Sequence, residues 1–315
     1  MHESSPIDPN FLQQQIEAAI VRTVAYVDVF DYPLTLNEVH RYLVETAAPL
    51  ATVQAILSNG RLIPHRLSQH QGYFALPGRE ELIAVRQRRA GVAQMMWPAA
   101  LRYGRVIHTL PFVRMVAITG SLAVDNVEPE ADVDYLIVTQ PGRLWLCRAL
   151  VILLVRVAAR QGFQLCPNYF VSERSLLFQE QNLYAARELT QMVPIAGLSL
   201  YYQMRQLNSW TAAFLPNADD LPRQLNGSPK EPALSPGRRS LRAFAEFLLR
   251  SPAGGRLEKW EMERKIRKFS RRYGNQGDGV AAFGPDWCKG HFHDHGRWVL
   301  DAFSGRLRQL EEREA

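Results

Sequence analysis

Residues 119–139 read TGSLAVDNVEPEADVDYLIVT, a stretch that joins a Gly-Ser pair, a polar loop and two aspartates inside an apolar run. Asp132 and Asp134 flank Val133, and the apolar residues that follow them predict a buried strand. Alternate side chains of a strand lie on one face, so both carboxylates are expected to project together. Like charges repel, and burial disfavours the charged form of each carboxylate, so the pattern predicts a cation between them.

Two strands frame the polar loop. Residues 113–118 are rich in β-branched and other apolar side chains and predict one strand, and residues 133–139 predict a second. The loop between them allows Gly120 and Ser121 to return close to the aspartates. Mg²⁺ takes oxygen ligands and commonly binds one or two carboxylates together with substrate phosphates. We therefore expect Mg²⁺, or Mn²⁺ in its place, at the aspartate pair.

Gly120-Ser121, ten intervening residues and an Asp-Val-Asp triplet resemble the signature of the DNA polymerase beta-like nucleotidyltransferase superfamily, over about residues 111–172. The resemblance implies an α+β fold with a small mixed sheet. It also implies transfer of a nucleoside monophosphate from a nucleoside triphosphate to an acceptor, here unknown. By this resemblance, Ser121 and the backbone N–H groups around Gly120 hold the phosphates, and Asp132 and Asp134 are the catalytic, metal-binding pair.

The third carboxylate that the resemblance implies is missing from its expected place. After a predicted helix over residues 143–160, Asn168 stands where an acid is expected. An asparagine oxygen can bind a metal but cannot act as a base, so Asn168 is predicted as a metal ligand only. Glu173 is the nearest carboxylate along the chain. The alternative is therefore a non-catalytic nucleotide-binding or DNA-associated regulatory protein on the same fold.

Residues 1–80 predict a separate N-terminal domain. Helices are expected over residues 11–30, 36–45 and 51–58, followed by two short strands joined at Gly72; Thr35 and Glu38 form a capping box before the second helix. This order resembles a winged helix. The third helix carries no Lys or Arg, and phosphate contacts dominate DNA affinity, so nucleic acid is only weakly supported as a partner. Protein contacts are the other interpretation.

The rest of the chain divides into two further predicted domains. Residues 81–182 are assigned to the nucleotidyltransferase-like domain, which begins with a helical stretch that we expect to break at Pro98. Residues 183–315 are assigned to a helical C-terminal domain with a flexible loop near 216–240. Residues 256–272 contain eight Lys or Arg against three Glu, which fits either a solvated helix or a surface that meets phosphates.

A second candidate metal site lies near the C-terminus. It comprises Cys288, His291, His293 and His295, whose side chains suit zinc, although histidines clustered in a loop explain the same pattern. Lys289, within this stretch, is a candidate to face a triphosphate.

Composition limits the class of protein. The chain has 315 residues, 47% of them hydrophobic, and a net charge of +6, which allows sizeable cores and an anionic partner.

Its three cysteines lie far apart, and no signal peptide is visible, which favours a cytoplasmic protein. Arg148 and Arg156 interrupt the apolar residues 144–159, so a buried helix is expected there and no membrane role.

Overall fold

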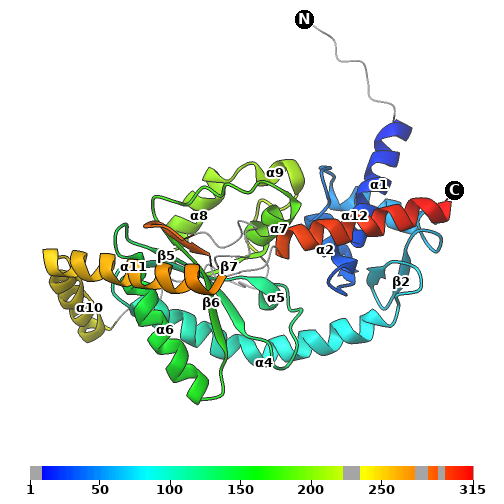
Figure 1. Cartoon of the computed structure of the whole chain (residues 1–315). Coiled ribbons are helices and arrows are strands. Elements are labelled where there is room, and N and C mark those ends of the chain that lie inside the picture. The colour runs from blue at the N-terminus through cyan, green and yellow to red at the C-terminus, as the bar shows by residue number, and fades with distance from the viewer. Residues whose placement is uncertain (1–8, 223–234, 274–282, 290–294, 315) are drawn as a thin grey trace, which may run out of the picture.

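The computed structural model describes residues 9–222, 235–273, 283–289 and 295–314. Within these ranges the chain is an α+β protein with a three-stranded antiparallel sheet and a five-stranded mixed sheet, surrounded by helices (Figure 1). The α+β class expected from the sequence is confirmed.

The N-terminal part contains three helices and a three-stranded sheet. Its elements are α1 (Pro9–Asp28), β1 (Leu34–Thr35), α2 (Leu36–Arg41), α3 (Leu50–Ser58), β2 (Ser68–His70) and β3 (Tyr73–Ala75), with sheet order β1-β3-β2. The predicted capping box is present, because Thr35 and Glu38 each accept the backbone N–H of the other. Helix α2 ends earlier than expected, since the Glu45 N–H bonds to the Phe214 carbonyl at 2.8 Å and not to its own helix.

Helix α4 (Leu82–Thr109) links the two sheets and continues through Pro98, so the expected break at this proline is wrong. A proline within a helix leaves the carbonyl four residues earlier without its donor. Here that residue is Gln94, and both Gln94 and Pro98 are exposed, so water is available to the freed carbonyl.

The five-stranded sheet carries the candidate site. Its strands are β4 (Val113–Ile118), β5 (Val133–Thr139), β6 (Leu165–Ser172), β7 (Val193–Ala196) and β8 (Trp287–Lys289), in the order β7-β4-β5-β6-β8. Strands β5 and β6 run parallel through the crossover helix α6 (Leu144–Arg160), and the other neighbours are antiparallel. The short helix α5 (Gly120–Ala123) lies between β4 and β5.

Two layers of helices cover the sheet. Tyr135 and Ile137 of β5 belong to the core shared with α4 and α6, whereas Leu136 and Val138 pack toward α7 (Leu183–Gln191) and α8 (Leu198–Leu207). This alternation follows from the two-residue period of a strand. Asp134 is in phase with Leu136, so its side chain lies on the α7 side of the sheet.

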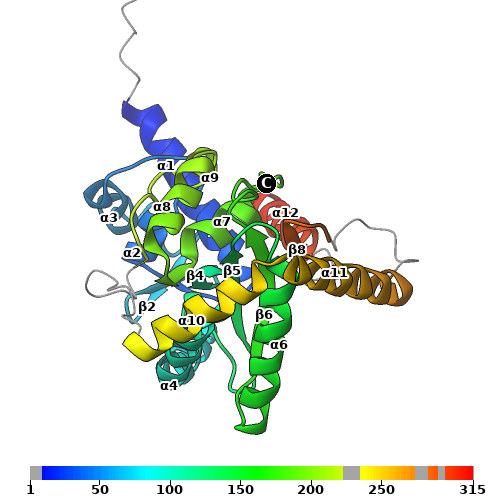
Figure 2. The same cartoon turned by 90° about the vertical axis from the view of Figure 1, so that its left-hand side faces the viewer.

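The segment 183–315 differs from the helical domain expected for it. Besides α9 (Thr211–Phe214), α10 (Pro236–Leu249), α11 (Pro252–Tyr273) and α12 (His295–Glu314), it supplies both edge strands of the large sheet, β7 and β8. Helices α10 and α11 pack on α4 and α6 (Figure 2), whereas α12 packs on α1, where Arg306 Nε lies 2.7 Å from Asp28 Oδ2. Strand pairing therefore ties this segment to the central sheet.

Two further expectations concern loops and membranes. Part of the loop expected near 216–240 falls on residues 223–234, outside the described residues, and α10 begins at Pro236. None of the helices in the described part of the chain is both long and apolar enough to cross a membrane.

Candidate functional site

Gly120 turns the chain from β4 into α5 and brings it against Asp134. Its φ of +66° lies in the left-handed region, and a Cβ at this position would lie 2.2 Å from Asp134 Oδ2. The neighbouring Thr119 N–H donates to the Asp134 carbonyl at 3.1 Å, which holds the turn on β5. Only glycine fits here without moving the Asp134 carboxylate.

Asp132 and Asp134 lie together at the start of β5, as predicted. Asp132 is exposed and Asp134 is partly buried, and one ligand atom of each, with the Cys166 sulfur, lies within 4.8 Å of the others. Within the described ranges, neither aspartate forms an ion pair with Lys or Arg. Burial, then the charges of Asp132 and Glu188, raise the pKa of Asp134 to about 7.

Cys166 is an unsuitable ligand for a hard cation. Burial and the two neighbouring aspartates raise the pKa of its thiol well above its usual value, so the thiol stays protonated at neutral pH. The donor set that remains, two carboxylates with no cationic side chain paired to them, fits Mg²⁺ or Mn²⁺.

Asn168 lies beside the aspartates because of a bulge in β6. Asp134 pairs with Cys166, but Leu136 pairs with Tyr169, so β6 carries one extra residue between these pairs. The Asn168 side-chain amide donates to Asp134 Oδ1 at 2.9 Å. The structure thus places Asn168 next to the predicted metal ligands, and its amide bonds to Asp134 through nitrogen.

Glu188 of α7 is a carboxylate that the sequence did not indicate. It accepts a hydrogen bond from the backbone N–H of Gly120, and burial raises its pKa to about 7. Glu173, the nearest acid along the chain, lies at the other end of β5, where its N–H bonds to the Thr139 carbonyl and its carboxylate lies 4.0 Å from Arg114 Nε. Glu188 is therefore the additional acid at the site, and Glu173 is not.

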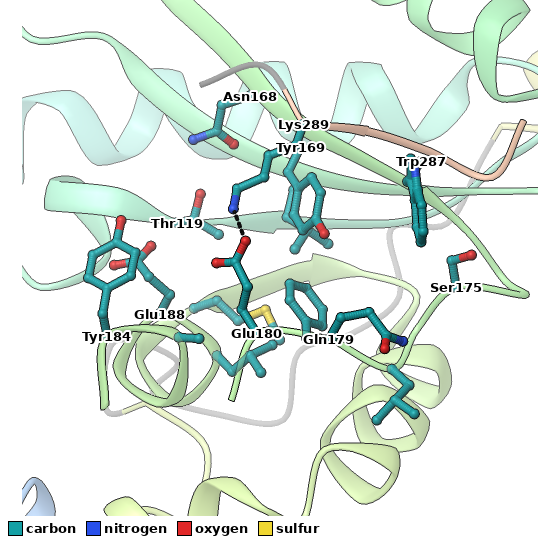
Figure 3. Close-up of a pocket in the computed structure, with 16 residues that line it drawn as sticks. Thr119, Asn168, Tyr169, Ser175, Gln179, Glu180, Tyr184, Glu188, Trp287 and Lys289 are labelled. Carbon is teal, nitrogen blue, oxygen red and sulfur yellow. Dashed lines mark hydrogen bonds and ion pairs between the residues drawn. The ribbon is translucent and has the colours of Figure 1, made fainter. Parts of the chain in front are cut away.

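Two cavities meet at this site. The first, of about 270 Å³, is lined by Gly120, Ser121 and Asp134, and also by Tyr26 of α1 and Phe30, which follows that helix. The second, of about 240 Å³, lies between the sheet and the segment that leads into α7 (Figure 3). The residues that line both are Asn168, Tyr184 and Glu188. The Gly-Ser turn and Asp134 thus border the first cavity, which meets the second at these three residues.

The predicted Cys-His cluster is described only in part. His291 and His293 lie outside the described residues. Cys288 is buried in the core between the sheet and α6, whereas His295 stacks on Trp298 and lines the first cavity. Zinc binding by this set stays a prediction.

Lys289 lines the second cavity, next to Cys288 on β8. Its Nζ forms an ion pair with Glu180 at 2.9 Å. Its expected role as a partner of a triphosphate stays a prediction.

No protein-family model, curated protein or solved structure matches the chain. The site is defined by the contact between the Gly-Ser turn and Asp134, with Asn168 bonded to Asp134 and Glu188 bonded to Gly120.

Proposed function

We propose that this protein is a Mg²⁺-dependent nucleotidyltransferase of the DNA polymerase beta-like type, which moves a nucleoside monophosphate from a nucleoside triphosphate to an acceptor hydroxyl. The close approach of Gly120 to the Asp134 carboxylate carries the proposal. It supports a site in which phosphates on the Gly-Ser turn and a cation on the aspartates are neighbours. The order of strand, Gly-Ser turn, aspartate strand, crossover helix and parallel strand supports the same conclusion.

The first cavity is the proposed nucleotide site. Ser121 offers its hydroxyl there, and Arg187, whose guanidinium lies 3.2 Å from the centre of the Tyr42 ring, adds a positive charge to the same wall. The Gly120 N–H already bonds to Glu188, so a phosphate must displace Glu188 from this amide or use the neighbouring donors. Tyr26 and Phe30 provide apolar surface for the nucleoside.

Asp132 and Asp134 are the proposed cation ligands. A bound Mg²⁺ would neutralise phosphate charge and orient an in-line displacement. Asp134 must lose its proton to bind the cation, and its raised pKa makes this step pH-dependent near neutrality. Asn168 fixes the orientation of the Asp134 carboxylate through its 2.9 Å hydrogen bond.

Glu188 is the proposed proton acceptor in place of the missing third acid. A general base works best when its pKa lies near the operating pH, and the pKa of Glu188 is raised to about 7. It borders both cavities, so it faces the junction where a second substrate meets the nucleotide.

The N-terminal part is proposed to be a winged helix that serves the site and does not bind DNA. Its helix α3 contains no Lys or Arg, whereas α1 supplies a wall of the first cavity. Tyr32, just after α1, donates to the Val124 carbonyl at 2.7 Å and so joins this part to the loop after the Gly-Ser turn. The winged helix thereby orders the nucleotide site.

A non-catalytic nucleotide-binding protein is the second candidate. The observation that favours it is Asn168, an amide where a catalytic acid is expected. The two candidates agree on nucleotide binding and differ only in turnover.

Calorimetric titration of the full chain with a non-hydrolysable nucleoside triphosphate, with and without Mg²⁺, tests the proposal. We expect Mg²⁺-dependent binding that Asp134→Asn abolishes and that Asp301→Asn, an exposed change on α12, leaves intact. Triphosphate affinity that is the same with and without Mg²⁺, or that is unchanged by Asp134→Asn, would contradict the shared metal site. Pyrophosphate release with candidate acceptors then separates an enzyme from a binding protein.

A further inference from the structure

The second cavity has the character of a small-molecule site. Most of its wall is aromatic or aliphatic, with Tyr169 and Trp287 among its members (Figure 3), and Phe178 also lines it. Its volume of about 240 Å³ is below the roughly 300–1,000 Å³ that drug-sized ligands occupy. Strand β8 supplies Trp287 and Lys289, so residues distant in sequence complete this wall.

Thr119 adds an unpartnered polar group to this cavity. Its side chain is 7% exposed, and its Oγ1 has no hydrogen-bond partner in the described part of the chain. This oxygen is closed to solvent in the structure, so a ligand bonds to it only after the Thr119 side chain rotates about χ1, and the bond then removes the cost of an unpaired buried hydroxyl. Figure 3 shows Thr119 at the same end of the cavity as Asn168 and Glu188.

The charges around the cavity are unsuited to a polyanion. Among the residues that the structure describes, Glu180 and Glu188 line it against a single cation, Lys289, which is already paired with Glu180. Nucleic-acid ends need cationic side chains along their phosphates. The lining therefore favours an uncharged ligand.

The two cavities are neighbours, because three residues line both of them. Gly120 and Ser121 line the first cavity, where the triphosphate is proposed to lie, whereas the second is reached past Asn168 and Glu188. The second cavity meets the first at Asn168, Tyr184 and Glu188, the residues that line both, so a molecule bound there lies next to the proposed nucleotide site.

We propose that the second cavity binds the acceptor, and that the acceptor is a small, uncharged alcohol or phenol with an aromatic or aliphatic body. This inference rests on the proposed nucleotidyltransferase function. The apolar body packs between Tyr169, Phe178 and Trp287, and the hydroxyl bonds to Thr119 near Glu188. In the reaction, the acceptor oxygen forms a bond to the α-phosphorus while the bond from that phosphorus to pyrophosphate breaks. The hydroxyl proton passes to the Glu188 carboxylate.

Ligand-observed NMR, which measures how two probes bind to the full chain, tests the proposal. The probes are 2-phenylethanol and ethylbenzene, which differ by one hydroxyl. We expect the alcohol to bind more tightly, and Thr119→Val, which keeps the shape but removes the hydroxyl, to reduce that preference about fivefold. Equal binding of the two probes, or an unchanged preference in Thr119→Val, would overturn the proposal.

A second pair of variants locates the probe. Leu177 lines the cavity and is 46% exposed, so Leu177→Trp narrows the mouth without a change to the core. Leu207, on α8, is 47% exposed and does not line the cavity, so Leu207→Trp is the matched control. We expect only Leu177→Trp to weaken 2-phenylethanol binding, by tenfold or more. Equal effects of both variants, or a short oligonucleotide that binds and is blocked by Leu177→Trp, would overturn the proposal.

Nucleotide titration of the same variants separates this inference from the proposed function. Leu177→Trp is expected to leave Mg²⁺-dependent triphosphate binding within about twofold, because Leu177 does not line the first cavity. Alcohol binding without triphosphate binding would contradict the proposed function, and the second cavity would then be a small-molecule site of another kind. Triphosphate binding that abolishes alcohol binding would contradict the acceptor assignment alone.

Discussion

The side-chain amide of Asn168 donates a hydrogen bond to Asp134 Oδ1 at 2.9 Å, across the parallel pair of strands β5 and β6. This bond stabilises the charged form of Asp134 and orients the carboxylate toward the Gly-Ser turn. The amide adds no negative charge, so β6 lacks the acid that the polymerase-like pattern implies at this position. The bulge in β6 turns Asn168 toward Asp134.

Asn168→Asp tests what the missing charge does. A carboxylate at this position would repel Asp134 when no cation is present, so the variant should lose about 1–3 kcal/mol of unfolding free energy in chelator. Saturating Mg²⁺ should recover most of the loss, because three carboxylates bind a cation more strongly than two. Thermal denaturation with and without Mg²⁺ measures both effects. Asn168→Leu, which removes the bond without adding charge, is the control, and equal Mg²⁺ responses in the two variants would contradict the idea.

Stability should depend on pH through Asp134. Its pKa rises from about 3.9 in the unfolded chain to about 7 in the folded state, so the folded protein holds a proton that the unfolded chain releases. The stabilisation is therefore complete below pH 4 and is lost as pH rises through 7. Because Asp134 is partly exposed, we expect a loss of about 1–2 kcal/mol from this group, less than the full linkage value.

Denaturant titrations between pH 4 and 8 measure this loss in metal-free buffer. Glu188, with a pKa of about 7, contributes in the same direction. Asp134→Asn should reduce the slope, and Asp134→Asn combined with Glu188→Gln should reduce it further. A slope that is the same in wild type and double variant would contradict the burial argument. Added Mg²⁺ should stabilise the wild type more as pH rises, because its ligands must be deprotonated.

The choice of proton acceptor is tested by two glutamine substitutions. General-base catalysis typically contributes about 10² to 10⁴ in rate, so Glu188→Gln should lower kcat by about that factor once an acceptor is known. Glu173→Gln should leave kcat unchanged, because Glu173 lies near Arg114 at the far end of β5. Both variants should still bind the triphosphate. If Glu173→Gln lowered kcat more than Glu188→Gln did, Glu173 would be the proton acceptor and Glu188 would not.

Local patterns in the sequence were enough to predict several elements. The strands at 113–118 and 133–139 have the predicted bounds, because β-branched and apolar residues end abruptly at polar loops and at Pro141-Gly142. The Thr35–Glu38 box marks a helix start through contacts between neighbours in sequence. Asn168 was also placed correctly beside the aspartates, since the parallel strand after a crossover helix lies next to the first.

Features that depend on distant contacts were not predicted. Strand β7 has only four residues, and β8 three, and each is a strand because the edge of an existing sheet offers it partners. Glu188 belongs to a helix with no acidic motif, and only folding brings it to the Gly120 amide. The wall that α1 contributes to the first cavity has the same origin.

Gly120→Ala gives a sharp test of the contact on which the site depends. Gly120 and Gly142 both have a left-handed backbone, with φ of +66° and +70°, so alanine at either position costs roughly 1–2 kcal/mol of backbone strain. A Cβ at residue 142 meets nothing within 4 Å, whereas one at residue 120 would lie 2.2 Å from Asp134 Oδ2. Gly142→Ala should therefore be destabilised by the strain alone and bind Mg²⁺ and triphosphate normally. Gly120→Ala should lose more stability and at least tenfold in Mg²⁺-dependent triphosphate affinity, because the Asp134 carboxylate must move. Denaturation and calorimetry on the two variants measure these effects, and equal triphosphate affinities would show that the Gly120–Asp134 contact is not part of the binding site.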